Sequence, residues 1–224
     1  MLNKDKHRQM LFDILKDIFE SNIAKNLAFK GWTACYFLHS LDRFSTDLDF
    51  DLVQDIKNID NEIINILKKY WNIKKWNKII LSYSNFDDNI KVDINRNIRK
   101  NNEYEIKNFY WTDIKVQKKG TIFANKLVAL VERNTNRDIY DVYFFFKNNW
   151  EINEKIITER TWKTKNELFR EIIKKLSSLW ENYKILDWLG EVLNPKQKAF
   201  VKEKLLKELI WKIEFELKFN IKEK

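Results

Sequence analysis

The sequence predicts an α+β protein, with a mixed sheet flanked by helices over residues 1–119 and a helical bundle over residues 120–224. Stretches in which apolar and polar residues alternate occur only in the first part, and such alternation is typical of half-buried strands. The second part has apolar residues at helical spacing almost throughout. A chain of 224 residues is also long enough to bury a core without cross-links.

The composition is that of a folded protein with excess positive charge. Apolar residues make up 44% of the chain and charged residues 33%, which argues against disorder. The net charge of +9 favours polyanionic partners, although a Lys-, Asn- and Ile-rich composition produces the same excess without any function. No stretch approaches the ~20 apolar residues of a membrane helix, so we expect a cytoplasmic protein without a membrane partner. Cys35 is the only cysteine, which excludes an internal disulfide bond and a cysteine zinc site.

The first part alternates between helices and strands. Its opening helix has apolar residues at the spacing of one buried stripe: Leu11, Ile14, Leu15, Ile18 and Phe19. Period-2 patterns and β-branched residues predict strands at 27–30, 47–52, 79–83, 90–94, 104–111 and 114–116. Helical spacing predicts helices at 33–40 and 56–67.

The second part reads as helices at 121–133, 137–147 and 165–180, with a last helix that begins at Pro195. Asn194 is a good N-cap, Pro is favoured at the first helical position, and Gln197 completes a capping box. We expect this last helix to bury Phe200, Leu205, Leu206, Leu209 and Ile210.

The most informative segment is the alternating strand at 47–52. Asp47, Asp49 and Asp51 share one face, because successive side chains of a strand point to opposite sides. Carboxylates that lie about 7 Å apart repel one another, and a divalent cation removes that conflict. Asp93 repeats the pattern on a second strand, so the set could hold two Mg²⁺ ions roughly 3.5–4 Å apart. The alternative is an ordinary solvated face of an amphipathic strand.

A glycine turn precedes this strand. The segment 27–30 is followed by Gly31 and a short helix, and a helix N-terminus after a tight turn presents free N–H groups to anions. The residues Lys30-Gly31-Trp32-Thr33, together with the segment RFSTDLDF at 43–50, closely resemble the AbiEii toxin family within the polymerase-β-like nucleotidyltransferase superfamily. The segments 90–94, 123–130 and 137–142 resemble the later motifs of that family in the same order.

The resemblance implies a Mg²⁺-dependent nucleotidyltransferase, with residues 1–119 as catalytic core and residues 120–224 completing the active-site cleft. It implies that a nucleotide moves from an NTP to the 3′ end of tRNA or another RNA, and that a cognate antitoxin protein is a partner. The implied metal ligands are Asp47, Asp49 and Asp93. The implied catalytic set adds Lys126, Asp138 and Asp141. The implied nucleotide-binding residues are Lys30, Gly31, Trp32, Thr33, Arg43, Ser45 and Arg137.

Two features leave alternatives open. Trp32 stands where the family has a second small residue, so it is a core residue, a stacking platform or a block to the nucleotide. Lys126 and Asp138 lie on inward helix faces, where they either contact nucleotide phosphates or pair with each other and with Arg133 or Asp141. The competing functions are an RNA- or protein-binding module with an impaired site, and a small-molecule nucleotidyltransferase.

Overall fold

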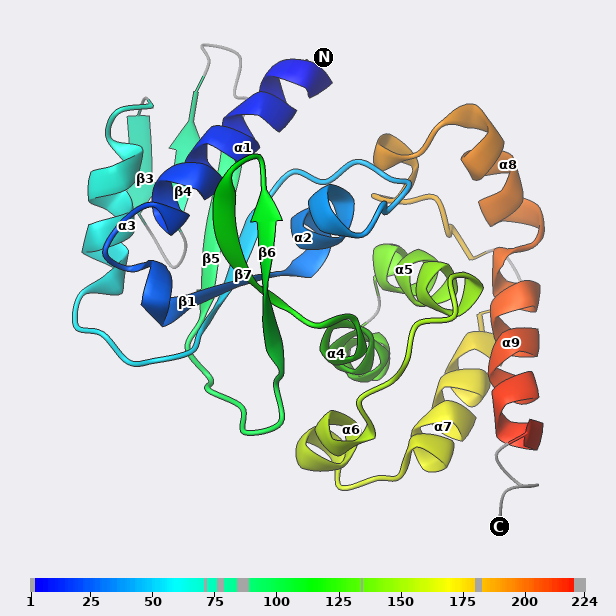
Figure 1. The fold of residues 1–224 in the computed structure, drawn as a ribbon. Helices are drawn as coiled ribbons and strands as arrows, with labels where there is room; N and C mark the ends of the chain where they lie inside the picture. The colour runs from blue at the N-terminus through cyan, green and yellow to red at the C-terminus, as the bar shows by residue number, and fades with distance from the viewer. Residues whose placement is uncertain are drawn as a thin grey trace. The chain divides into compact units, whose positions relative to one another are not determined.

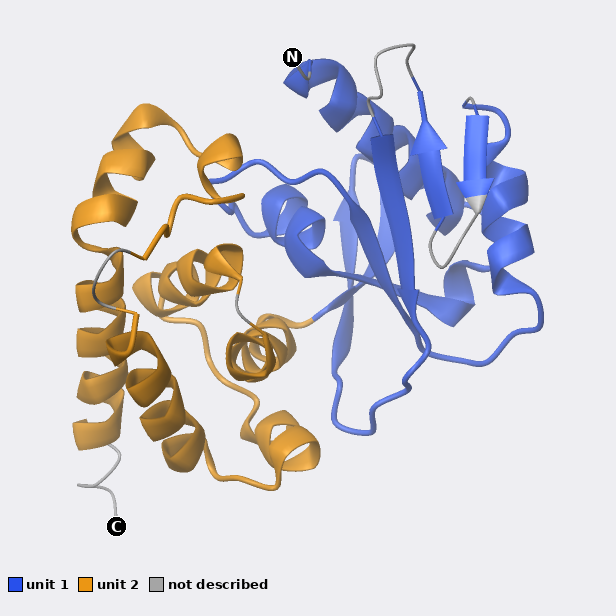
Figure 2. Cartoon of the chain, turned by 180° about the vertical axis from the view of Figure 1, so that it is seen from behind, with its two compact units in different colours: residues 1–117 blue, residues 118–224 orange. Residues whose placement is uncertain are grey.

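The computed structural model describes residues 3–70, 72–75, 79–83, 89–133, 135–179 and 183–219 (Figure 1). The chain divides into two compact units, Met1–Gln117 and Lys118–Lys224 (Figure 2). The first unit is a mixed sheet with helices and the second is helical, which confirms the α+β fold class. Within the described ranges, every helix is too short or too polar to cross a lipid bilayer.

The first unit is built on a seven-stranded sheet with the strand order β3-β4-β5-β2-β1-β7-β6. Strand β2 lies in the middle of the sheet, parallel to β5 and antiparallel to β1, and β1 is parallel to β7. The strands are β1 (Leu27–Lys30), β2 (Leu48–Leu52), β3 (Asn72–Lys75), β4 (Ile79–Ser82), β5 (Asn89–Asn95), β6 (Tyr104–Phe109) and β7 (Thr112–Gln117).

One face of this sheet is the core of the unit. Helices α1 (Lys4–Phe19) and α3 (Ile59–Leu67) cover that face, and all five residues of the predicted α1 stripe are buried in it (Figure 1). Leu48, Phe50 and Leu52 of β2 point into the same core. The carboxylates that alternate with them are therefore on the opposite face of the sheet. A 3-10 turn (Ala24–Asn26) precedes β1, and helix α2 (Gly31–Leu38) follows it directly.

The second unit is a set of packed helices. Helix α4 contacts α5, α6 and α7, and α9 contacts α5 and α7. The helices are α4 (Lys119–Glu132), α5 (Asn136–Lys147), α6 (Glu154–Thr161), α7 (Lys165–Ser177), α8 (Pro195–Glu203) and α9 (Leu205–Phe219), with a 3-10 turn at Gly190–Val192. The capping box predicted for Asn194 and Gln197 is present at the start of α8.

Several expected elements differ in the structure. The last helix is broken at Lys204, so that its buried stripe is Val201, Leu205, Leu209 and Ile213. Phe200, Leu206 and Ile210 are only partly buried, which corrects the expectation. Neither β3 nor α6 is in the sequence prediction, because both are short and contain few apolar residues. The helix predicted at 165–180 ends at Ser177, and Trp180 lies outside the described residues.

Candidate active site

Two of the three predicted metal ligands are neighbours in the middle of the sheet. Asp49 of β2 and Asp93 of β5 are register partners on adjacent parallel strands, so their side chains leave the sheet side by side on the same face. Asp47 lies two residues before Asp49, directly ahead of β2. The sheet therefore brings the carboxylates of Asp47, Asp49 and Asp93 together, as the alternating pattern predicts.

The glycine turn lies against the Asp49 carboxylate. Gly31 has φ +71°, a left-handed conformation that glycine adopts without steric cost. A Cβ atom at this position would be 2.6 Å from Oδ2 of Asp49. Two independent constraints therefore require glycine here, the backbone angle and the space that the carboxylate occupies. The first turn of α2 begins at Gly31 without a side-chain cap, and an uncapped helix start of this kind can bind an anion with its amide N–H groups.

The electrostatics of Asp49 show the effect of this crowding. Burial raises the pKa of the Asp49 carboxyl, and the negative charges of Asp47 and Asp93 raise it further. Lys91 and Lys30 act in the opposite direction and lower it. The carboxylate cluster is thus destabilised by its own charge and partly relieved by two lysines.

The donor set fits a divalent cation by its chemistry. Mg²⁺ prefers carboxylate oxygens, and substrate phosphates commonly complete its coordination shell. Among the described residues, however, no group of three or more His, Cys, Asp or Glu side chains has the geometry of a complete metal site. Asp47, Asp49 and Asp93 therefore supply suitable ligands without forming a closed cage.

Hydrogen bonds fix the segment that leads into β2. Thr33 of α2 is fully buried, and its hydroxyl donates to the carbonyl oxygen of Asp47 and lies 2.8 Å from Oγ of Ser45. From α1, His7 places Nε2 3.0 Å from the carbonyl oxygen of Thr46 and Nδ1 2.5 Å from Oη of Tyr83. The side chains of Thr33 and Ser45 thus hold the loop in place, and a role for them at the nucleotide stays a prediction.

Trp32 is half-buried and is covered by a cation. The guanidinium of Arg43 lies 4.5 Å from the centre of the Trp32 ring, and Arg43 also donates from Nη1 to the carbonyl oxygen of Phe44. Arg43 itself is buried. Among the described contacts, both side chains are therefore engaged with the protein, while a role at the nucleotide stays a prediction for each.

Asp51 belongs to a separate polar network. It is 1% exposed and forms an ion pair of 2.8 Å with Lys30. Side-chain donors from three other segments also reach its carboxylate, and they are Asn95, Asn102, Tyr104 and Gln117. A buried carboxylate is tolerated only with such partners. Asp51 therefore fixes Lys30 next to the glycine turn.

In the second unit, Lys126 and Asp138 form a buried ion pair with an N–O distance of 2.5 Å. Arg133 donates to both oxygens of Asp138 at 2.7 and 3.1 Å, and the Thr135 hydroxyl donates to it as well. Asp141 is 4.0 Å from the Lys126 ammonium. Burial alone would raise the pKa of Asp138, but the cations lower it to about 2. Lys126 and Asp138 thus pair with each other, which was one of the two alternatives. Their contact with nucleotide phosphates, the other alternative, stays a prediction.

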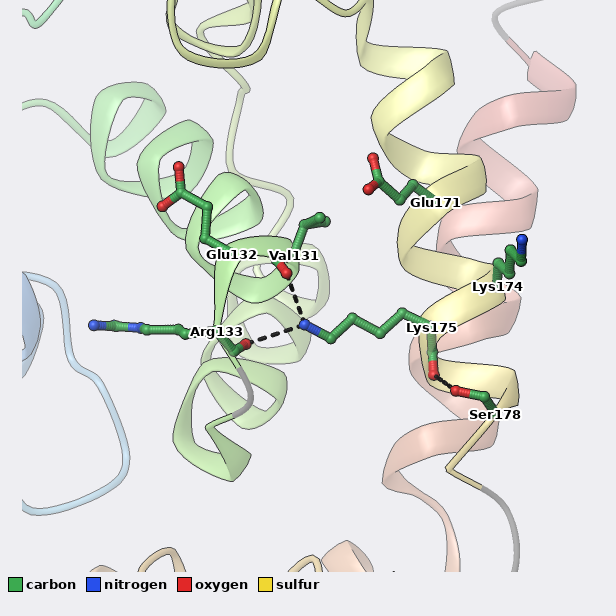
Figure 3. Close-up of a pocket in the computed structure, with 7 residues that line it drawn as sticks. All are labelled: Val131, Glu132, Arg133, Glu171, Lys174, Lys175 and Ser178. Carbon is green, nitrogen blue, oxygen red and sulfur yellow. Dashed lines mark hydrogen bonds between the residues drawn. The ribbon is translucent and has the colours of Figure 1, made fainter.

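A lysine of α7 bonds the C-terminal end of α4, close to Arg133. Lys175 donates from Nζ to the carbonyl oxygens of Leu130, Val131 and Arg133, at 2.7, 2.8 and 3.2 Å (Figure 3). It thereby caps the end of α4, whose last carbonyl groups have no partner within the helix. Arg137, in contrast, donates from Nε to the carbonyl oxygen of Trp188 and has no described bond to the Asp138 cluster.

Comparisons with known proteins show the family of this chain. The family model described as nucleotidyl transferase AbiEii toxin, type IV TA system, matches residues 13–208. The chain belongs to the AbiEii family. AbiEii proteins are nucleotidyltransferase toxins of toxin–antitoxin systems, and this chain is therefore a toxin-type nucleotidyltransferase. A comparison with curated proteins finds no match.

Solved structures share the AbiEii fold of this chain. The JHP933 protein of Helicobacter pylori is 19% identical, with a TM-score of 0.60, and 100% of this chain and 99% of that chain are covered. A second H. pylori structure, titled a putative nucleotidyltransferase, is 20% identical with a TM-score of 0.58 and coverage of 96% and 97%. MenT4, a nucleotidyltransferase toxin from Mycobacterium tuberculosis, is 14% identical with a TM-score of 0.57 and coverage of 93% and 82%.

The contacts of three side chains near the carboxylates of this AbiEii protein were not predicted from the sequence. Lys91 had a usable signal, because it lies two residues before Asp93 on a strand and so shares its face. Asp51 was placed on the correct face, but its network depends on residues far apart in the sequence. His7 had no signal, since one histidine in an amphipathic helix does not reveal its partners. It also lies outside the residues that the family model matches.

Proposed function

We propose that this AbiEii protein is a Mg²⁺-dependent enzyme that transfers a nucleotide from an NTP to the 3′ end of tRNA. The observation that carries the proposal is the meeting of Asp49, Asp93 and Gly31 at one point of the sheet. Asp49 and Asp93 offer carboxylates that could bind a metal ion, and the helix that starts at Gly31 offers N–H groups that could bind phosphate. The net charge of +9 supports a polyanionic acceptor.

In the proposed reaction the 3′-hydroxyl oxygen of the RNA attacks the α-phosphorus of the NTP, and pyrophosphate leaves with the electrons of the broken bond. Asp47, Asp49 and Asp93 would hold the divalent ions, which reduce the negative charge of the phosphates when bound. The N–H groups of the first turn of α2 would bind phosphate oxygens. Asp93 would also help to activate the attacking hydroxyl by accepting its proton.

Charged residues of the second unit would also act on the nucleotide. Lys126 would steady phosphate charge, with Asp138 and Asp141 holding its ammonium in place. Arg137 would add a further positive charge. An antitoxin partner follows from the type IV toxin–antitoxin description of the family, and we propose that the toxin acts on RNA until its antitoxin counteracts it.

The test is a transfer assay with purified protein, Mg²⁺, total tRNA and each of the four labelled NTPs in turn. We expect label on the 3′ end of tRNA and its loss in Asp49→Asn. The matched control is Asp113→Asn, because Asp113 is an exposed carboxylate on β7 of the same sheet. Transfer only to a small molecule would contradict the RNA acceptor. The absence of transfer with any NTP, despite tight tRNA binding, would favour an RNA-binding module.

A further inference from the structure

A lysine lies among the carboxylates of the candidate site. Lys91 is on β5, two residues before Asp93, so the two side chains share a face of the sheet. The Nζ atom of Lys91 is 3.3 Å from Oδ2 of Asp93. The two side chains are 30% and 36% exposed, so an incoming ion can reach both.

The charge of Lys91 also acts on Asp49. Asp49 is the register partner of Asp93, and a cation beside one of these carboxylates is therefore close to both. The other lysine near the site, Lys30, is ion-paired with Asp51 at 2.8 Å. Lys91 is thus a counter-charge that the neighbouring carboxylates of Asp49 and Asp93 share.

We propose that Lys91 is a resident cation of the carboxylate site, which neutralises the Asp93 side of the site and which a divalent ion must displace. The inference rests on the proposed function, because it takes Asp47, Asp49 and Asp93 as metal ligands. An ammonium and a divalent ion repel each other when they share carboxylate oxygens. Lys91 therefore weakens the binding of free metal, and the phosphates of an NTP supply the negative charge that makes metal binding favourable. The site selects a metal–nucleotide complex over the metal alone.

The experiment measures Mn²⁺ binding to the full-length protein without NTP, by titration calorimetry or by the electron paramagnetic resonance signal of free Mn²⁺. Lys91→Met removes the charge and keeps most of the aliphatic stem. We expect it to bind Mn²⁺ about tenfold more tightly than the unmodified protein, since a unit charge and a divalent charge no longer repel. Lys91→Arg keeps the charge and should bind Mn²⁺ as the unmodified protein does.

The chain contains a closely matched control. Lys107 on β6 forms an ion pair with Glu105 at the same 3.3 Å distance and the same two-residue spacing, and these side chains are 31% and 37% exposed. Lys107→Met therefore removes an equivalent surface pair elsewhere in the sheet. Its affinity for Mn²⁺ should not change. Thermal unfolding without metal shows whether each variant is folded, and Lys91→Gln replaces Lys91→Met if that variant is not.

Each outcome has one meaning. Tighter Mn²⁺ binding by Lys91→Met that disappears when Asp49→Asn is added supports the proposal. Equal or weaker binding by Lys91→Met, with binding that still depends on Asp49, overturns the role of Lys91 and leaves the metal site intact. If neither the unmodified protein nor Lys91→Met binds Mn²⁺ through Asp49 without NTP, Lys91 is not what weakens the binding of free metal and the inference is overturned, whereas the proposed function is decided separately by the transfer assay with NTP and Mg²⁺.

Discussion

Gly31 shows how a single residue decides the geometry of the candidate site. Its positive φ turns the chain from β1 into α2 within one residue, and its missing side chain leaves room for the carboxylate of Asp49. In the proposed site, a phosphate group at the helix start and a metal ion on the carboxylate would be close together, because Gly31 has no side chain between them. The position of Gly31 therefore couples the two halves of the site.

We predict that Gly31→Ala reduces nucleotidyl transfer about 100-fold, because the new Cβ must displace the Asp49 carboxylate, and small displacements of reacting groups have effects of this size. The left-handed backbone adds a stability cost of about 1 kcal/mol. Activity and denaturant unfolding measure the two effects separately. Gly190→Ala is the control, because a Cβ there would meet its nearest neighbour at an ordinary 3.6 Å. Full activity in Gly31→Ala would contradict the close packing of the turn and the carboxylate.

Single residues also show what could be predicted from the sequence. Asp47, Asp49 and Asp93 were predictable, because strand alternation fixes the face of each residue and only the pairing of the two strands had to be assumed. The inward position of Lys126 and Asp138 was predictable from helical spacing. Their ion pair was one of two interpretations, since a helical wheel gives a direction and not a partner. The bonds of His7 were not predictable at all.

At the scale of elements, two helices fix the loop that carries Asp47. Helix α1 contributes His7, whose ring forms a hydrogen bond with the carbonyl oxygen of Thr46. Helix α2 contributes Thr33, whose hydroxyl donates a hydrogen bond to the carbonyl oxygen of Asp47. Buried carbonyl groups need such donors. The loop is thereby held at two consecutive residues, directly before the carboxylates begin.

We predict that His7→Ala lowers the free energy of unfolding by about 2 kcal/mol, because the carbonyl of Thr46 loses its donor and the buried ring leaves a cavity. Chemical denaturation measures the change. Gln9→Ala is the comparison on the same helix, since Gln9 forms only an exposed bond with Asp13, and it should change stability by less than about 0.5 kcal/mol. Equal effects of the two substitutions would show that His7 does not hold the loop.

The end of α4 provides a second test at this scale. Lys175 of α7 adds a side-chain donor at the end of α4, with one ammonium group on three carbonyl oxygens. We predict that Lys175→Met lowers the free energy of unfolding by about 1 kcal/mol, the typical value of a charge at a helix C-terminus. Lys174→Met is the control, because Lys174 points away from α4 (Figure 3). The same loss in both variants would contradict the capping role.

For the whole molecule, the mixed sheet and the helical unit were predictable, while element boundaries were less so. The alternation and the helical stripes decide which type of element forms, because burial of apolar surface dominates stability. The break at Lys204 was missed because a stripe at i, i+4 and i+8 is compatible with one continuous helix and with two helices. The strand β3 was missed because an edge strand needs few apolar residues.

The stability of the whole molecule in acid depends on Asp138. Its pKa is lowered to about 2 from an ordinary 3.8, so its ion pairs stabilise the folded state fully above about pH 4 and are lost as the pH falls through about 2. We predict that Asp138→Asn is less stable than the unmodified protein by at least about 2 kcal/mol at pH 7. The difference should shrink between pH 4 and pH 2 when unfolding is followed by circular dichroism. A difference that is constant over this range would contradict a charged Asp138.

We propose that this AbiEii protein performs nucleotidyl transfer on the face of the sheet that carries Asp47, Asp49 and Asp93, next to Gly31. A crystal structure with Mn²⁺ and a non-hydrolysable NTP analogue tests it most directly, because anomalous scattering locates manganese independently of the protein. We predict manganese within bonding distance of the Asp47 and Asp49 carboxylates, with the triphosphate at the first turn of α2. Manganese and nucleotide bound elsewhere, with these carboxylates free of both, would contradict the claim.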